Sequence, residues 1–260
     1  MSRASGRASS GVAETVKTIV YAVIIALFIR TFFYEPFSIP SASMVPTLLV
    51  GDYLFVSKFS YGYSRYSLPF GLPLIPGRVF FTEPQRGDVV VFKLPRDPSI
   101  DFIKRIVGLP GDTIQVKDGV LAINGQPVRR EKAGSYVYDE NGRNSTYALY
   151  TETLPNGVRH PELQVDEDLS KCDPDKSSLC FMNNTPVFTV PPGHYFMMGD
   201  NRDNSSDSRD PNSGVGYVPA ENLVGRAVFI FYSTDGYSRW WEVWNWPFTI
   251  RYDRLFSAIH

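Results

Sequence analysis

The chain has 260 residues, and its 26 Lys and Arg against 27 Asp and Glu give a formal net charge of -1. This length is sufficient for one substantial domain or two smaller ones. The balanced charge, without a cluster of basic residues, argues against nucleic-acid binding. Twenty glycines and twenty prolines among many β-branched and aromatic residues favour short strands and turns over a helical bundle.

The N-terminus predicts a membrane anchor. Residues 1–14 are small, polar and basic, which is typical of a disordered tail. Residues 15–34 follow, and the 19 residues Thr15 to Phe33 would span about 28 Å as a helix, close to the hydrocarbon thickness of a bilayer. A buried helix and a cleaved signal peptide are the alternatives. The run ends in Phe-Phe-Tyr-Glu-Pro-Phe without a small-x-small site, which argues against cleavage.

Charge flanking the apolar segment predicts its orientation. Arg3, Arg7 and Lys17 precede its uncharged core, and only Arg30 follows within two dozen residues. The positive-inside rule then places the N-terminus in the cytoplasm and everything after Tyr34 on the extracytoplasmic side of the plasma membrane. In that oxidising compartment Cys172 and Cys180 are candidates for a disulfide, although two free thiols remain an alternative.

Beyond the anchor, the pattern predicts a mainly β, antiparallel domain. We expect its core to comprise residues 35–128 and 187–260, because apolar runs such as DYLFVSKF and GDVVVFKLP alternate with turn signals. The stretch DFIKRIVGLPGDTIQVKDGVLAINGQPV contains Lys-Asp-Gly and Asn-Gly turns and indicates hairpins in series.

Two regions differ from this core. Residues 129–186 are polar and charged and are interpreted as an inserted subdomain that carries both cysteines. The tail has all four tryptophans within seven residues, which suits a membrane–water interface or ordinary packing near the chain end.

The candidate chemistry involves serine and lysine. The chain has no His-x-x-x-His motif and no clustered cysteines, so neither a metal nor another cofactor is expected. His160 and His194 lie in stretches that do not resemble a catalytic site. Lys104 lies among apolar residues of a predicted strand. A neutral lysine base requires a pKa about three units below its ordinary ~10.4, a cost of about 4 kcal/mol that burial can impose.

Three motifs carry a resemblance. PSASMVPTL (Pro40 to Leu48), IKRIVGLPGD (Ile103 to Asp112) and GDNRDNSSDSR (Gly199 to Arg209), in this order behind an N-terminal anchor, resemble the bacterial type I signal peptidases. The resemblance covers nearly the whole chain apart from the N-terminal tail and the insert. It implies a membrane-bound serine endopeptidase that cleaves exported preproteins after Ala-x-Ala sites with a serine-lysine dyad.

The resemblance also implies residue roles. Ser43 falls on the family's nucleophile and Lys104 on its general base. Ser41 occupies the position whose hydroxyl joins the Ser43 amide in the oxyanion hole, and Ala42 stands where glycine is frequent. Ser205 matches the serine that orients the lysine amine, and Asp207 and Arg209 match an ion pair near the site. Arg105, which follows the lysine, is also assigned a supporting role.

Substrate binding is placed on the same segments. Strands around EPFSIPS and DFIKRIV are predicted to bind an extended peptide by β-augmentation. The residues expected to line its pockets are Phe37, Ile39, Pro40, Phe102 and Ile103. The expected partners are preproteins and membrane lipid.

Three alternatives stay open at this stage. One is a specialised relative that matures a pilin. Another is a self-cleaving repressor-type protein, although a membrane anchor occupies the place of its DNA-binding domain. The third is a non-enzymatic envelope protein whose motif serines are ordinary loop residues.

Overall fold

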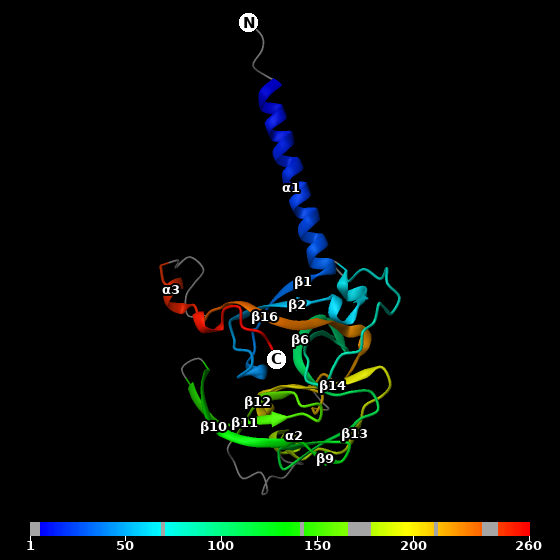
Figure 1. Ribbon diagram of the computed structural model, residues 1–260, viewed down its shortest axis with the longest axis vertical. Coiled ribbons are helices and arrows are strands. Elements are labelled where there is room, and N and C mark those ends of the chain that lie inside the picture. Colours follow the sequence, from blue (N-terminus) through cyan, green and yellow to red (C-terminus); the bar gives the residue numbers. More distant parts are fainter. Residues whose placement is uncertain (1–5, 69–70, 141–142, 166–177, 211–212, 236–243) are drawn as a thin grey trace.

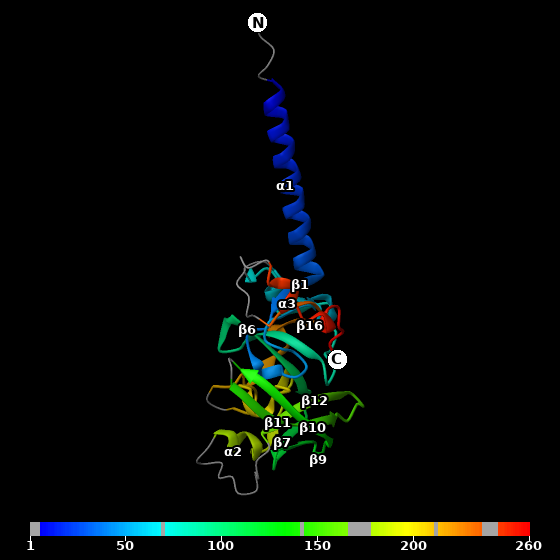
Figure 2. The same ribbon diagram turned by 90° about the vertical axis from the view of Figure 1, so that its left-hand side faces the viewer.

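The computed structural model describes residues 6–68, 71–140, 143–165, 178–210, 213–235 and 244–260. A long N-terminal helix, α1 (Gly6–Phe32), projects from a body made of several antiparallel sheets (Figures 1 and 2). The predicted mainly β fold with one N-terminal apolar helix is therefore confirmed.

From Gly11 to Phe32 every residue of helix α1 except Thr31 is exposed, and this portion is long and apolar enough to cross a membrane. The helix begins at Gly6, so it extends into the stretch that the sequence predicted as a disordered tail. Two hydrogen bonds help to join its C-terminal end to the body: the Lys58 amide donates to the carbonyl of Phe33, just after the helix, at 2.9 Å, and the Tyr63 hydroxyl donates to the carbonyl of Phe32 at 2.9 Å.

The largest sheet has seven strands in the order β1-β2-β16-β5-β6-β14-β15. Its strands are β1 (Tyr34–Ser38), β2 (Asp52–Ser57), β5 (Val89–Leu94), β6 (Asp97–Gly108), β14 (His194–Met198), β15 (Tyr217–Pro219) and β16 (Leu223–Ser233). Apolar side chains of these strands contribute to two buried clusters, which include Leu54 and Val56 in one and Phe92 and Met197 in the other. The strands that carry the candidate lysine and its neighbours are thus held in the interior.

A second sheet confirms the predicted turns. It has four strands in the order β13-β7-β8-β9, with β7 (Thr113–Lys117), β8 (Val120–Ile123), β9 (Gln126–Pro127) and β13 (Phe188–Thr189). Asp118 and Gly119 have φ values of 47° and 73°, and Asn124 and Gly125 have values of 53° and 75°. Two consecutive positive φ values are what a tight hairpin turn requires.

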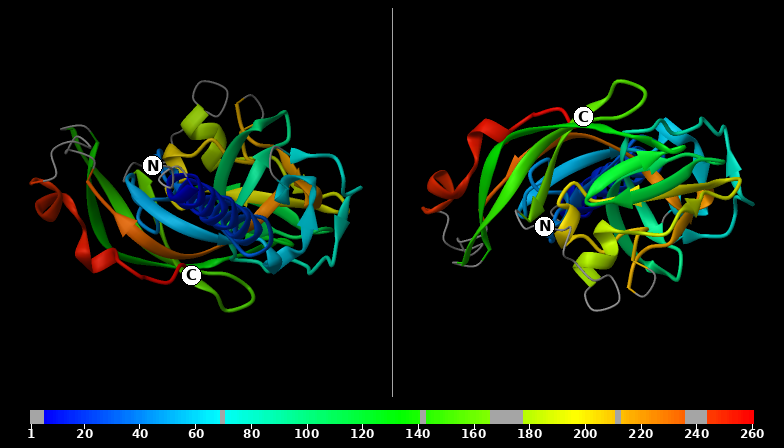
Figure 3. Two further views of the ribbon diagram at one scale, coloured as in Figure 1. Left: turned by 90° about the horizontal axis from the view of Figure 1, so that it is seen from above. Right: turned by 90° about the horizontal axis from the view of Figure 1, so that it is seen from below.

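A third, three-stranded sheet begins where the sequence placed the start of the insert. It consists of β10 (Arg129–Glu140), β11 (Arg143–Thr153) and β12 (Arg159–Val165). Figure 3 shows the long β10–β11 pair curving along one flank of the body. Strand β12 joins the catalytic motif directly, since the Leu163 amide donates to the Asp200 carbonyl at 2.8 Å. The predicted insert is therefore packed against the core and carries buried polar residues.

The remaining elements are short. They are the β3–β4 pair (Tyr63–Ser64 and Arg78–Val79), the helices α2 (Ser178–Asn183) and α3 (Trp246–Thr249), and several 3-10 turns. Cys180 in α2 is disulfide-bonded, but Cys172 lies outside the described residues, so their pairing stays a prediction. In the tail, Trp244 is 66% exposed, while Trp240 and Trp241 lie outside the described residues. Trp244 therefore does not pack in the core.

Candidate active site

Ser43 lies in a 3-10 turn, Ala42–Met44, that its neighbours hold in place. Met44 is fully buried in the core beneath β2, and Val45 is buried in a separate cluster with Leu163. The Ser43 carbonyl accepts from the Asn201 amide at 3.1 Å. These contacts on both sides of the turn hold the backbone of Ser43 in place and so restrict the position of its hydroxyl.

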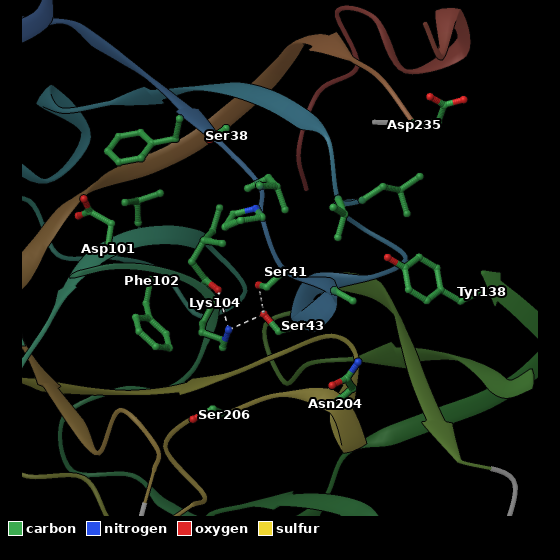
Figure 4. Close-up of a pocket in the computed structure, with 18 of the residues that line it drawn as sticks. Ser38, Ser41, Ser43, Asp101, Phe102, Lys104, Tyr138, Asn204, Ser206 and Asp235 are labelled. Atoms are coloured by element: carbon green, nitrogen blue, oxygen red, sulfur yellow. Dashed lines mark hydrogen bonds between the residues drawn. The ribbon is translucent and has the colours of Figure 1, made fainter. Parts of the chain in front are cut away.

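Lys104 reaches that hydroxyl from β6. Its Nζ donates to Ser43 Oγ at 2.6 Å and to the Ile103 carbonyl at 3.1 Å (Figure 4). Its side chain is 3% exposed. Burial lowers the pKa of Lys104 to about 8, with Asp207 and Asp200 opposing this shift and Arg209 adding to it. Near physiological pH roughly a tenth to a fifth of the amine is therefore neutral, far more than for a solvated lysine.

Ser41 lies at the open side of the same site. Its Oγ is 3.4 Å from Ser43 Oγ, and its side chain is exposed (Figure 4). The Ser41 hydroxyl thus lies beside that of Ser43, and both residues line the same cleft.

The segment from Gly199 to Arg209 forms the floor of the site. Asp207 and Arg209 make a buried, bidentate ion pair, with Arg209 Nε and Nη2 donating to the two carboxylate oxygens at 3.0 and 2.8 Å. Burial opposes ionisation of Asp207, but Arg209 and backbone donors hold its pKa below the ordinary value. Gly199 must be glycine, because an added Cβ would lie 2.5 Å from the Ser43 carbonyl and 2.2 Å from Ser205 Oγ.

Ser205 does not make the hydrogen bond to Lys104 that the resemblance implies. Its side chain is buried, and its Oγ has no hydrogen-bond partner among the described residues. The expected hydrogen bond to the lysine amine is therefore wrong for this structure, because Lys104 Nζ bonds to Ser43 and to the Ile103 carbonyl instead. The hydroxyl still packs against Gly199 at the floor of the site.

The side chain of Arg105 lies on the face of β6 opposite to that of Lys104, because successive side chains of a strand point to opposite faces. Its guanidinium binds both carboxylate oxygens of Asp200 at 2.8 and 2.7 Å, and it also donates to the Gly87 carbonyl. Burial opposes ionisation of Asp200, but Arg105 keeps its pKa below the ordinary value. The pair ties β6 to the third motif.

A buried ionic cluster behind this pair was missed from the sequence. His160 lies between Asp200 and Glu152, with Nδ1 3.5 Å from the Asp200 carboxylate and Nε2 3.1 Å from that of Glu152. Arg202 contacts Glu152 and, at 2.6 Å, Glu162. All five side chains are at most 2% exposed. Three of them come from the predicted insert, and no motif or spacing in that polar stretch indicated that it would fold against the site.

A cleft of about 1200 Å³ opens over the dyad. The five residues predicted to bind substrate all line it, namely Phe37, Ile39, Pro40, Phe102 and Ile103. Residues of β10, including Tyr136 and Tyr138, line its other wall (Figure 4). The structure therefore brings the predicted nucleophile, base and pocket residues together in one groove.

Comparison with known proteins assigns the family. Residues 12–232 match the family model described as signal peptidase, peptidase S26. The chain belongs to this family. It is 39% identical over its full length to 98% of signal peptidase I from Rickettsia typhi, and 41% identical over 95% of its length to 94% of the Rickettsia canadensis protein. A solved signal peptidase I from Enterococcus faecalis aligns with 56% of this chain and 97% of its own at 27% identity, with a TM-score of 0.31.

Membership of the signal peptidases confirms the family predicted from the three motifs. The protein is a serine peptidase that removes signal peptides, and its substrates are preproteins that bear them. Its N-terminal apolar helix is consistent with a membrane anchor. Family membership also argues against the repressor-type and non-enzymatic alternatives.

Proposed function

We propose that this signal peptidase cleaves preproteins with a dyad in which Ser43 is the nucleophile and Lys104 the general base. The observation that carries the proposal is the 2.6 Å contact between Lys104 Nζ and Ser43 Oγ inside a cleft. A buried amine with a lowered pKa can accept the serine proton without assistance from an imidazole.

The reaction divides into two proton-balanced halves. Neutral Lys104 takes the Ser43 proton as Oγ attacks the scissile carbonyl, and the resulting ammonium then protonates the leaving amine. An acyl-enzyme on Ser43 remains. Lys104 next deprotonates a water molecule, whose attack on the ester releases the signal peptide and returns the proton to Ser43.

The oxyanion is proposed to be held by the Ser41 hydroxyl and the Ser43 amide. Ser41 Oγ lies 3.4 Å from Ser43 Oγ, and the Ser43 amide belongs to the same 3-10 turn as the nucleophile. Donors that are already oriented before reaction stabilise developing negative charge without reorganisation. Arg105, Ser205, Asp207 and Arg209 act behind the dyad as supporting residues.

Specificity for Ala-x-Ala is assigned to the walls of the cleft. Strand β1 is an edge strand, and β14 pairs only with the Arg105–Gly108 part of β6. An extended peptide can therefore pair with backbone beside β1 and beside residues 101–104 of β6. Phe37, Ile39, Pro40, Phe102 and Ile103 would leave room only for small side chains one and three positions before the cut.

The organisation of the chain is part of the proposal. Residues 15–34 anchor the enzyme in the plasma membrane with residues 1–14 in the cytoplasm. The catalytic core, 35–128 with 187–260, and the 129–186 subdomain lie on the extracytoplasmic side. Three basic residues before the uncharged core of the anchor support this orientation.

The test is cleavage of a secretory preprotein by wild type and Ser43→Ala, with the cut located by mass spectrometry. We expect one cut after Ala-x-Ala by wild type, none by the variant, and loss of cleavage when either alanine is replaced by leucine. Cleavage by Ser43→Ala would refute the nucleophile. Failure on general preproteins with cleavage of a pilin precursor would favour the specialised relative.

A further inference from the structure

A second cavity lies where α1 joins the body. It encloses about 560 Å³ and is lined on one side by Leu27, Arg30 and Thr31 of α1. Phe37 and Asp101 line both this cavity and the catalytic cleft, so the two are neighbours. The segment after β2 folds against the base of α1 beside it (Figures 1 and 2). We refer to this cavity as the anchor pocket.

The anchor pocket has an excess of positive charge. Its lining includes four basic side chains, Arg30, Lys58, Arg65 and Lys93, but only two carboxylates, Glu35 and Asp101. The formal charge of the lining is therefore +2, from four positive and two negative groups. An anion is the ligand that such a lining favours.

The ion pairs inside the pocket do not use all of this charge. Arg30 and Lys58 share one partner, since they contact the two oxygens of Glu35 at 2.6 and 2.8 Å. Lys93 pairs with Asp101 at 2.9 Å. Two cations on one carboxylate leave one unit of positive charge uncompensated.

Arg65 supplies the second unit. No carboxylate of the described residues lies within salt-bridge distance of it, and its Nε is buried without a hydrogen-bond partner. Its guanidinium lies 4.6 Å from the centre of the Tyr66 ring, and Nη2 donates to the Tyr66 hydroxyl. A guanidinium oriented by a ring and free of a carboxylate is well suited to bind a phosphate group.

We propose that the anchor pocket binds the phosphate of an anionic phospholipid headgroup. A lipid suits the position better than free phosphate does, because Leu27 lines the pocket and is 45% exposed on the membrane-spanning helix. An acyl chain can follow α1 from there while the headgroup phosphate contacts Arg65 and its basic neighbours. Such a lipid would lie between the anchor and the catalytic cleft.

The test titrates lipid onto the full-length protein in a neutral detergent and counts bound lipid by native mass spectrometry. Phosphatidylglycerol is the probe, and zwitterionic phosphatidylcholine is the reference lipid. Arg65→Gln removes a cation that pairs with no carboxylate, so it leaves no charge unpaired. Arg129→Gln is the matched control, because Arg129 is 77% exposed and lies on β10 in a different sheet.

We expect phosphatidylglycerol to bind wild type about tenfold more tightly than phosphatidylcholine does, and Arg65→Gln to weaken its binding about tenfold. Arg129→Gln should leave it unchanged, and Arg65→Lys, which keeps the charge, should restore part of the affinity. Cleavage of a soluble peptide in neutral detergent should be the same for all variants, which also shows that they are folded.

Equal phosphatidylglycerol affinity for wild type and Arg65→Gln, or an equal loss in Arg129→Gln, would overturn the proposal. Inorganic phosphate that displaces the lipid with similar affinity would assign the pocket to free phosphate instead. A loss of preprotein binding in Arg65→Gln, with lipid binding intact, would assign the pocket to substrate and overturn the proposal as well.

Discussion

At the scale of single residues, Lys104 combines a functional gain with a stability cost. Its pKa is lowered from 10.5 to about 8 by burial, so the folded state holds fewer protons than the unfolded state between these values. The free energy of unfolding therefore rises with pH across that window. Below pH 8 the buried amine costs about 3 kcal/mol relative to a solvated lysine. The fold tolerates this cost, which gives the proposed base a pKa close to neutral pH.

Lys104→Met tests both the proposed base role of Lys104 and the stability cost of burying its amine. The variant keeps the length of the side chain without the amine, so preprotein cleavage should fall by at least about 10³-fold. The cost of burying a charge also disappears, and the melting temperature at pH 7 should be equal to or above that of wild type. A folded variant that still cleaves above trace level would place the base elsewhere.

Ser41→Ala tests the oxyanion assignment. Loss of one donor typically lowers the rate by about 10²- to 10³-fold, so the variant should be weakened but active. The loss should appear in kcat and leave KM nearly unchanged, because the donor acts on charge that develops in the transition state. Wild-type turnover would remove Ser41 from the oxyanion hole.

At the scale of elements, β11 and β12 contact the third motif through buried ion pairs. Glu152, at the end of β11, and Glu162, on β12, hold Arg202 of the catalytic segment from two sides. Burial raises the pKa of Glu162 to about 7. Burial also opposes the ionisation of Glu152, but Arg202 and His160 hold its pKa below the ordinary value. The insert is thus linked to the segment that supports Ser43.

Arg202→Met should expose this dependence. Removing one partner of a buried ion pair leaves uncompensated charge and typically costs about 3–5 kcal/mol. We expect a melting temperature lower by several degrees and a reduced kcat/KM. The control is Glu131→Gln, which breaks an exposed pair with Arg129 on the same sheet and should cost less than about 1 kcal/mol. Equal stability of the two variants would contradict a structural role for the cluster.

At the scale of the whole molecule, the anchor and the catalytic body are nearly separate. Helix α1 contributes little to the core, because its side chains are exposed along almost all of its length. Its base nevertheless lies near the catalytic cleft, because Phe37 and Asp101 line both that cleft and the pocket at the base of α1.

Removal of residues 1–29 should therefore leave the rate of peptide cleavage nearly unchanged but slow the encounter with membrane-embedded substrates. Cleavage of a soluble peptide should stay within about twofold of wild type, since every dyad contact lies in the body. Cleavage of a preprotein embedded in vesicles should slow by tenfold or more, because the effective concentration supplied by the anchor is lost. Parallel assays on the two substrates check this, and an equal loss on both would make the helix part of the catalytic body.

The sequence predicted those features that follow from local pattern or from the motifs. The N-terminal apolar helix, the hairpin turns at Asp118 and Asn124, and the proximity of Ser43 to Lys104 belong to this group. The cluster around His160 could not be predicted, because it depends on β12 docking against a segment some 40 residues later. The contacts of Ser205 depend on side-chain packing at Gly199, which no spacing encodes.

The central claim is that the neutral form of the buried Lys104 amine takes the proton from Ser43, and the pH dependence of kcat/KM tests it most directly. We predict that kcat/KM for a signal-peptide substrate rises with pH through a single apparent pKa near 8, because only the deprotonated amine can act as the base. A profile that is flat between pH 6 and 9, or that falls as pH rises, would contradict the account.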